Sequence, residues 1–176
     1  MKHPALRLAF LGMATLLIAA CAAAPRRVPF NEAEFIPTSG KGTGTVVGRA
    51  YATTKDGVTH YAQRSLMDMV PVNAYTTETD QRRFINGEKL AAGDPRYEKY
   101  IRSVWTDENG DFVFHNIPPG DYYIGGEVVW HFPSEMYVNA SDGTSSAEPI
   151  EGSASHLVHG RVTVRNGQTS RVDVTW

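Results

Sequence analysis

Three histidines in the last third of the chain are the side chains best suited to chemistry near neutral pH. They are His131, His156 and His159. In a strand, residues three apart point to opposite faces, so His156 and His159 cannot hold one metal ion from regular β-structure. A metal-dependent hydrolase that uses all three histidines is an alternative only if they lie on a loop. Glu135 or Glu151 would then supply a further ligand.

The sequence lacks the other familiar catalytic motifs. It contains no Gly-x-Ser-x-Gly elbow, no His-Glu-x-x-His zinc helix, no P-loop and no dinucleotide-binding glycine cluster. The acidic turn 107–111 has the start of a calcium loop, but Phe112 stands where that loop needs glycine and Pro118 where it needs glutamate. We therefore expect a protein that is not an enzyme, that holds no cofactor or metal, and that binds no nucleotide.

Aromatic side chains are the better candidates for ligand contact. Trp105, Trp130, Phe132 and Tyr137 fall near expected strand ends or in the segment 131–154. Exposed aromatic rings on a β-domain can stack on sugar rings or anchor a protein partner. Trp130 alternates with expected core positions, so it is assigned to the core. The candidate contact residues are Trp105, Phe132 and Tyr137.

The chain begins with the pattern of an export signal. Lys2 and Arg7 are followed by an apolar run from Leu8 to Ala20. Thirteen helical residues rise about 20 Å, which is less than the roughly 30 Å hydrocarbon core of a bilayer. Residues 1–20 are therefore predicted to be a signal peptide rather than a transmembrane helix.

The single cysteine of the chain follows this run directly. Ile18-Ala19-Ala20-Cys21 resembles the lipobox of bacterial lipoproteins, in which cleavage precedes the cysteine and the cysteine carries the lipid. The resemblance implies that Cys21 is lipidated and that the three residues before it are the recognition site for signal cleavage. Alanine at position 22 implies, by the same resemblance, an outer-membrane lipoprotein of the cell envelope. The alternative is an ordinary secretory signal with a chance cysteine.

Residues 21–42 are interpreted as the lipidated cysteine and a tether. Three prolines and two glycines in 22–42 favour an extended spacer. Phe30, Phe35 and Ile36 either dock on the domain or stay exposed. Removing residues 1–20 takes away two basic side chains and no acidic one, which changes the formal charge from −2 to −4. A weakly acidic protein without Lys/Arg runs is not expected to bind nucleic acid.

From residue 43 onward, short alternating apolar segments separated by turn residues indicate β-structure. The polar segment 77–98 predicts an insertion with a short helix from Thr79 or Asp80 to about Leu90. Residues 133–154 predict a polar loop, and Asn166-Gly167 predicts a hairpin whose buried face holds valines and Trp176. The expected strands are 43–51, 58–62, 67–76, 100–105, 111–116, 121–132, 156–165 and 170–176.

One segment carries a family signature. It reads Thr106-Asp107-Glu108-Asn109-Gly110-Asp111-Phe112-Val113-Phe114-His115-Asn116-Ile117-Pro118-Pro119-Gly120-Asp121-Tyr122. This phrase resembles the signature of carboxypeptidase-regulatory-like domains, which are transthyretin-like β-sandwiches. The resemblance implies an all-β fold over 43–176, a Greek-key sandwich of seven or eight strands with one short helical insertion at about 77–98. Its structural residues are Asp107, Gly110, Phe112, Phe114, Pro119, Gly120 and Tyr122.

This signature specifies a hairpin and a core rather than a reaction, so the fold alone does not select a function. The leading hypothesis is a non-catalytic, lipid-anchored envelope protein whose β-sandwich is a binding or scaffold module that contacts an envelope protein. The first alternative is a carbohydrate-binding module, and the second is the hydrolase considered above. The expected partners are the membrane, through the N-terminal lipid, and an envelope protein or a polysaccharide. The insertion 77–98 and the segment 131–154 are the expected contact regions.

Overall fold

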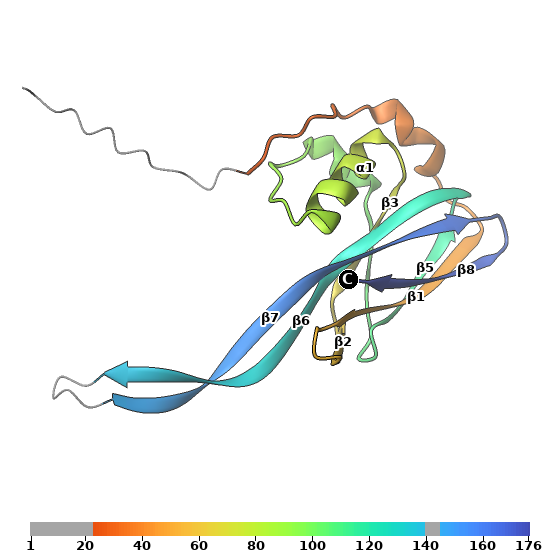
Figure 1. Cartoon of the computed structure of the whole chain (residues 1–176). Helices are drawn as coiled ribbons and strands as arrows, with labels where there is room; N and C mark the ends of the chain where they lie inside the picture. Colours follow the sequence, from red (N-terminus) through yellow and green to blue (C-terminus); the bar gives the residue numbers. More distant parts are fainter. Residues whose placement is uncertain (1–22, 140–144) are drawn as a thin grey trace, which may run out of the picture.

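A mixed, curled sheet of eight strands forms most of the part of the chain that the structure describes (Figure 1). The computed structural model describes residues 23–139 and 145–176. The strand order is β2-β1-β8-β7-β6-β3-β4, and β5 pairs with β1 outside this order. The strands are β1 (Gly44–Thr53), β2 (Thr59–Tyr61), β3 (Leu66–Pro71), β4 (Arg102–Trp105), β5 (Asp111–Ile117), β6 (Gly120–Asn139), β7 (Ser145–Val164) and β8 (Thr169–Thr175).

Strand pairing confirms the β-rich class that the sequence predicts. Strands β1 and β8 are parallel, whereas the other registered pairs are antiparallel. Strand β7 joins β8 only through the registered pair His159↔Thr175, although the Asn166-Gly167 turn connects the two strands. Strand β8 therefore takes its main pairing from β1.

The core lies along the inward-facing residues of these strands. Side chains alternate between the two faces of a strand, and one face of β1, of β3 and of β5 is buried. Trp176, which was expected in the buried face of the last hairpin, is 53% exposed, because β8 ends one residue earlier. The buried residues of the core include Val46, Ala50, Met67, Met69, Phe112, Phe114, Tyr122, Ile124, Val128, Val158, Val162, Val164 and Val174.

The signature segment 106–122 shapes a tight turn and contributes to this core. The Asp107 carboxylate accepts hydrogen bonds from the backbone N–H groups two and four residues later, at 2.8 and 2.9 Å. Gly110 has φ of +78°, which a residue with a side chain rarely adopts. Phe112 and Phe114 are buried with ring centroids 5.7 Å apart. The Tyr122 hydroxyl donates to the carbonyl of Pro118 at 2.9 Å, so its one polar atom is satisfied inside the core.

The segment 133–154 corrects the sequence-based prediction, because most of it is paired β-structure instead of a loop. Strands β6 and β7 keep one register from Gly120↔Val164 to Asn139↔Ser145. Beyond the sheet they continue as a two-stranded ribbon, residues 131–139 and 145–153, which we call the β-ribbon (Figure 1). Water reaches both faces and both edges of such a ribbon, so polar residues and prolines are tolerated there. This is why composition alone suggested a loop.

The insertion also differs from the prediction in its starting point. Helix α1 spans Ala74–Thr79, a π-helical turn follows at Asp80–Ile85, and a 3-10 helix spans Pro95–Tyr100. The Asn73 side chain accepts from the backbone N–H of Thr76, and the Thr76 hydroxyl accepts from the N–H of Asn73, both at 3.0 Å. This capping box starts the helix about five residues before the predicted position and ends the preceding strand at Pro71.

The described part of the predicted tether is folded onto the insertion. Ala24 forms a β-bridge with Leu90, and short 3-10 helices span Glu32–Glu34 and Ile36–Thr38. The Phe35 ring is fully buried, in an aromatic cluster that includes Phe30 and rings from the insertion. Ile36 is exposed. Burial of a phenylalanine side chain contributes about 1.5–3 kcal/mol, which explains why this segment is not a free spacer.

None of the helices in the described ranges is long and apolar enough to cross a membrane. The predicted signal peptide, the lipobox residues Ile18, Ala19 and Ala20, and Cys21 lie outside the described residues.

Candidate ligand-binding cleft

A cleft of about 440 Å³ lies between the insertion and the outer face of the sheet. Helix α1 and the π-helical turn form one wall, strands β3 and β6 form the floor, and β4 brings Trp105 to one end. The insertion lies over the outer face of β6, on the side away from the core (Figure 1). We call this space the insertion cleft.

An ordered row of residues crosses four strands beneath the insertion and includes the cleft residues Asp68 and Gly125. Ser103 of β4 faces Asp68 of β3, Asp68 faces Gly125 of β6, and Gly125 faces His159 of β7. Directly opposite residues in a sheet share a face, so this row lies on the outer surface under the insertion. The Ser103 hydroxyl donates to the Asp68 carboxylate at 2.6 Å, which holds that carboxylate in place.

The insertion is seated on this row through a glycine. A Cβ on Gly125 would lie 2.6 Å from the Phe84 ring, so only glycine allows the ring to approach the strand so closely. The Phe84 ring also stacks on His159, with centroids 5.9 Å apart. His159 Nδ1 lies 2.9 Å from the Asp80 carboxylate on the same helical turn of the insertion. These contacts set the distance between the insertion and the sheet.

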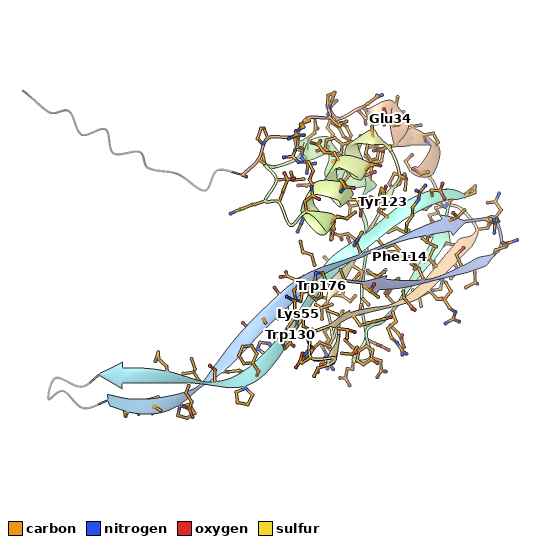
Figure 2. All side chains as sticks on the ribbon, in the orientation of Figure 1. Glu34, Lys55, Phe114, Tyr123, Trp130 and Trp176 are labelled. Carbon is orange, nitrogen blue, oxygen red and sulfur yellow. The ribbon has the colours of Figure 1, made fainter. Side chains whose placement is uncertain are left out.

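Four aromatic rings line the cleft. Trp105 is 68% exposed and is the most accessible of them, while Tyr123 is on β6 and lies below the insertion (Figure 2). The Tyr123 hydroxyl is 3.3 Å from the Thr77 hydroxyl. Burial raises the pKa of Tyr97 well above its ordinary value, so its hydroxyl is neutral at physiological pH and can donate a hydrogen bond. Phe84 is the fourth ring.

Charged groups of both signs complete the lining. Asp68, Asp80 and Glu127 supply carboxylates, and Arg26 and Arg83 supply guanidinium groups. The Arg26 guanidinium donates to the Thr79 hydroxyl at 2.9 Å and lies over the Tyr75 ring, 4.7 Å from its centroid. Nε of Arg26 is buried and has no hydrogen-bond partner in the described residues. The cleft therefore combines flat apolar rings with donors and acceptors in close proximity.

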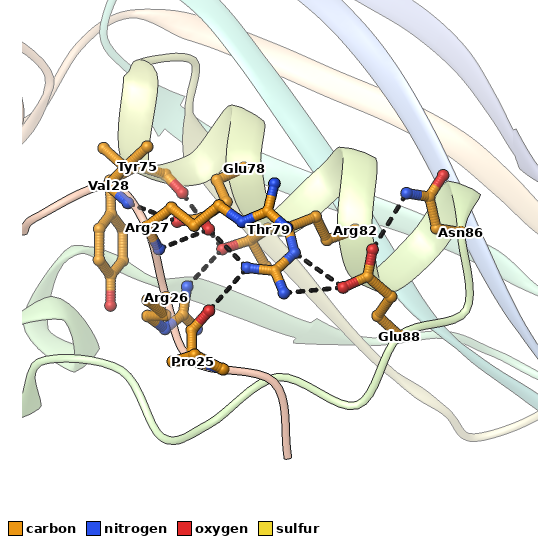
Figure 3. Close-up of polar contacts among 10 residues, drawn as sticks. All are labelled: Pro25, Arg26, Arg27, Val28, Tyr75, Glu78, Thr79, Arg82, Asn86 and Glu88. Carbon is orange, nitrogen blue, oxygen red and sulfur yellow. Dashed lines mark hydrogen bonds and ion pairs between the residues drawn. The ribbon is translucent and has the colours of Figure 1, made fainter. Parts of the chain in front are cut away.

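A buried ion pair stabilises the wall of the cleft and the segment before it (Figure 3). The Glu78 carboxylate lies 2.7 Å from the Arg82 guanidinium, and both side chains are buried. The same carboxylate accepts from the backbone N–H of Arg27 at 2.7 Å and of Val28 at 3.0 Å. Arg82 also donates to the carbonyl of Pro25 at 2.8 Å. We call this set of contacts the clasp.

The clasp determines the ionisation of Glu78. Burial by itself would raise the pKa of this carboxyl, because it disfavours the charged form. The hydrogen bonds from the N–H groups of Val28 and Arg27 and the Arg82 guanidinium outweigh burial and lower the pKa to about 2. Glu78 is therefore ionised over the physiological pH range.

The three histidines of the hydrolase alternative do not converge. His131 lies 3.8 Å from Glu151 on the β-ribbon, and His159 is paired with Asp80 at the insertion. His156 stacks on Trp176, with centroids 3.8 Å apart, on the opposite face from His159. In residues 23–139 and 145–176, no three His, Cys, Asp or Glu side chains form a group that could hold a metal ion.

The aromatic candidates from the sequence are separated in the structure. Trp105 lines the insertion cleft, whereas Phe132 lies on the β-ribbon and is 42% exposed. The side chain of Tyr137 lies outside the described residues. Trp130 is partly buried at the base of the ribbon, where it stacks on His60 at 4.4 Å, near Trp176 (Figure 2).

Most of the cleft was missed by sequence reasoning. The length of the 77–98 insertion indicated a contact region, but no motif distinguished its individual residues. Strand alternation placed Tyr123, Gly125 and Glu127 on one face, yet the helical wall opposite them could not be inferred. The cleft residues without a sequence signal of their own are Asp68, Asp80, Arg83, Phe84 and Tyr97.

Comparison with solved structures finds a similar β-rich protein in Pseudomonas aeruginosa. That protein carries a provisional assignment as a carbohydrate-binding protein. The two chains are 28% identical, the match covers 84% of this chain and 97% of the other, and the TM-score is 0.62. No protein-family model matches the chain. No curated protein matches it either.

Two pilins show a more distant likeness. The major pilin subunit of Bacillus cereus is 17% identical over 76% of this chain and 30% of its own, with a TM-score of 0.32. The minor pilin of Streptococcus agalactiae is 10% identical over 77% of this chain and 44% of its own, with a TM-score of 0.34. With scores this low, neither pilin informs the function of this chain.

Proposed function

We propose that this chain is a non-catalytic, lipid-anchored protein of the cell envelope that binds a saccharide in the insertion cleft. The observation that carries the proposal is the exposed Trp105 ring in a cleft that also holds Asp68, whose carboxylate is held by a hydrogen bond from Ser103. An exposed indole offers a flat apolar surface to a sugar ring, and a fixed carboxylate offers an acceptor for sugar hydroxyls.

The mixed charges of the cleft favour a hydroxylated ligand. Asp68, Asp80 and Glu127 stand beside Arg26 and Arg83, so the lining supplies acceptors and donors without one dominant sign. A volume of about 440 Å³ falls in the usual range for small-molecule sites. The similarity to the Pseudomonas aeruginosa protein supports the same class of ligand.

The location and family belong to the same proposal. The lipobox-like Ile18-Ala19-Ala20-Cys21 supports anchoring through Cys21 and, with alanine at position 22, an outer-membrane location. The signature at 106–122 supports a carboxypeptidase-regulatory-like sandwich. A glycan-binding module of this kind would meet its polysaccharide at the membrane surface.

Glycan binding by a Trp105→Ala variant tests the proposed site. The mature protein is screened on a glycan array, and the best glycan is titrated by calorimetry. Loss of ring stacking is expected to weaken binding about tenfold, since about 1.4 kcal/mol corresponds to a factor of ten. Trp176→Ala is the matched control, because Trp176 is also exposed but does not line the insertion cleft.

The proposal would be refuted if the wild-type protein bound no glycan. It would also be refuted if both tryptophan variants lost affinity equally, since the site would then not involve the insertion cleft.

A second candidate function is contact with an envelope protein through the β-ribbon. Phe132, Met136 and Ile150 are 42%, 51% and 41% exposed. Phe132, Ser134 and Met136 alternate along β6, and Ile150 is the register partner of Ser134, so all three apolar residues share one face. That face continues the core-facing side of β6, and apolar surface of this kind often marks a protein contact.

Shortening the ribbon tests this second candidate. Residues 132–152 are replaced by Asn-Gly, a favoured two-residue hairpin turn, and crosslinked membranes are compared with wild type. We expect the specific crosslinked partner to disappear while glycan binding is kept, because no ribbon residue lines the insertion cleft. Recovery of the same partner from the shortened protein would contradict the candidate.

A further inference from the structure

We propose that the anchored protein rests on the membrane with one defined face, formed by residues 24–28 and the loop 86–93, and that the tip of the β-ribbon stays clear of the lipid. We call this surface the exit face, because the chain leaves the described fold there toward Cys21. The inference rests on the proposed lipid anchoring at Cys21. Its partner is the surface of a bilayer that contains anionic phospholipid.

The first argument is the short chain between the anchor and the fold. The backbone N–H of Ala24 donates to the carbonyl of Lys89 at 2.8 Å, and the N–H of Ala91 donates to the carbonyl of Ala24 at 2.9 Å. Cys21 lies three residues before Ala24, and three fully extended residues span at most about 11 Å. A free tether over 21–42 would reach roughly 60 Å. The fold therefore begins close to the lipid.

The second argument is the strength of the attachment beyond Ala24. The clasp holds the next residues through Glu78, which accepts from two backbone N–H groups, and through Arg82, which donates to the carbonyl of Pro25. Both side chains are buried, so water does not compete with these contacts. The segment cannot lengthen by peeling away unless these hydrogen bonds to the buried ion pair break.

The third argument is the charge of the exit face. The side chains of Arg27 and Lys89 are exposed there. Arg83, beside this face, is also exposed and lines one hollow of about 510 Å³ with Lys89 and the loop. The nearby Glu88 carboxylate is paired with Arg82 at 2.7 Å. Basic side chains close to an anionic bilayer are attracted to it within roughly a Debye length, which is about 8 Å at physiological ionic strength.

The β-ribbon has the opposite charge. The sequence from 127 to 157 contains no Lys or Arg, and its acidic residues are Glu127, Glu135, Asp142, Glu148 and Glu151. The β-ribbon runs away from the insertion (Figure 1). From Gly125, which the insertion covers, to Val138 near the ribbon's end, thirteen residues extend about 40 Å. An anionic surface attracts the exit face and repels the β-ribbon.

Energy transfer from two positions to a labelled bilayer tests this orientation. A clickable amino acid at Ala92 on the exit face, or at Ser146 on the ribbon, carries the donor dye and leaves Cys21 free for lipid. Vesicles of phosphatidylcholine and phosphatidylglycerol contain a headgroup-labelled acceptor lipid. We expect several-fold more efficient transfer from position 92 than from position 146. Equal transfer from both, or stronger transfer from 146, would overturn the inference.

Charge reversal tests the role of the basic residues. The double variant Arg27→Glu and Lys89→Glu is expected to lower transfer from position 92 while the protein stays bound to vesicles. Arg165→Glu with Arg171→Glu is the matched control, because both arginines are exposed outside the exit face, Arg165 in the turn after β7 and Arg171 on β8. If the two double variants behave alike, attraction between this face and anionic lipid is refuted.

Two preparations separate this inference from the anchoring proposal. One is the lipoprotein purified from bacterial membranes, and the other is residues 21–176 coupled through the Cys21 thiol to a maleimide lipid. If cells attach no lipid, anchoring at Cys21 is refuted, yet the coupled chain still reports which face meets the bilayer. If cells attach lipid but both preparations give equal transfer from the two positions, only the orientation is refuted.

Discussion

At the scale of single residues, Glu78 shows how one side chain connects distant parts of this chain. Its carboxylate holds backbone groups about fifty residues earlier and the guanidinium one helical turn later. In the sequence, Glu78 and Arg82 have the i,i+4 spacing of an ordinary exposed ion pair. In the structure, residues 25–28 pack over this pair and bury it. The pair therefore matters more for stability than an exposed one, because a broken buried pair leaves an uncompensated charge.

We predict that Glu78→Gln lowers the free energy of unfolding by about 3–5 kcal/mol, because Arg82 loses a buried counter-charge. The wild type should also lose stability as the pH falls from about 4.5 toward 2. The Glu78 pKa is lower in the folded protein, at about 2 against an ordinary 4.5, so the unfolded chain takes up a proton first. Urea unfolding measured at a series of pH values should show no such loss of stability for the Glu78→Gln variant.

Glu98→Gln is the control for this measurement, because Glu98 is exposed and outside the clasp. It should unfold like the wild type at neutral pH. Superimposable pH curves for the wild type and Glu78→Gln would show that the clasp does not couple to folding.

At the scale of elements, the insertion and the sheet fit each other through a flat patch on β6. Gly125 leaves room for Phe84, and its register partner His159 supports the same ring and pairs with Asp80. The cleft is the space that this seating leaves beside β3 and β4. Its shape therefore depends on one strand position that lacks a side chain.

We predict that Gly125→Ala displaces the insertion and weakens glycan binding. The added methyl group would meet the Phe84 ring at 2.6 Å, so the ring must move outward. A loss of about 1 kcal/mol in unfolding free energy is expected, at the low end for overpacking, because a side chain rather than backbone must give way. Hydrogen exchange should become faster in residues 80–90.

Gly40→Ala is the matched control, since no atom lies within 4 Å of a Cβ built there. Unchanged hydrogen exchange in the insertion of Gly125→Ala would mean that the Phe84 contact does not seat it.

At the scale of the whole molecule, the basic residues and the acidic residues gather on different parts of the structure. The described chain begins beside the insertion, where exposed basic residues gather. The β-ribbon extends in another direction and contains acidic residues but no Lys or Arg (Figure 1). The insertion cleft lies on the outer face of the sheet. If the exit face meets the membrane, the cleft opens beside the bilayer and the ribbon extends beyond it, toward a second partner.

The β-rich class and the faces of β6 could be predicted from the sequence, because side-chain alternation is a local property of an extended chain. The β-ribbon could not, because solvent on both of its faces removes the usual contrast between apolar and polar positions. The start of α1 was misplaced because the capping box at Asn73 and Thr76 follows directly on an apolar strand.

The sequence by itself determined the lipobox-like context of Cys21, the turn at 107–110 and the aromatic positions along the strands, since each depends on neighbouring residues. Only the tertiary structure decided that residues 24–42 are docked, that Glu78 and Arg82 are buried, and that Trp105 shares a cleft with Phe84 and Tyr97. Those facts arise from packing between segments far apart in the chain, which local patterns do not encode.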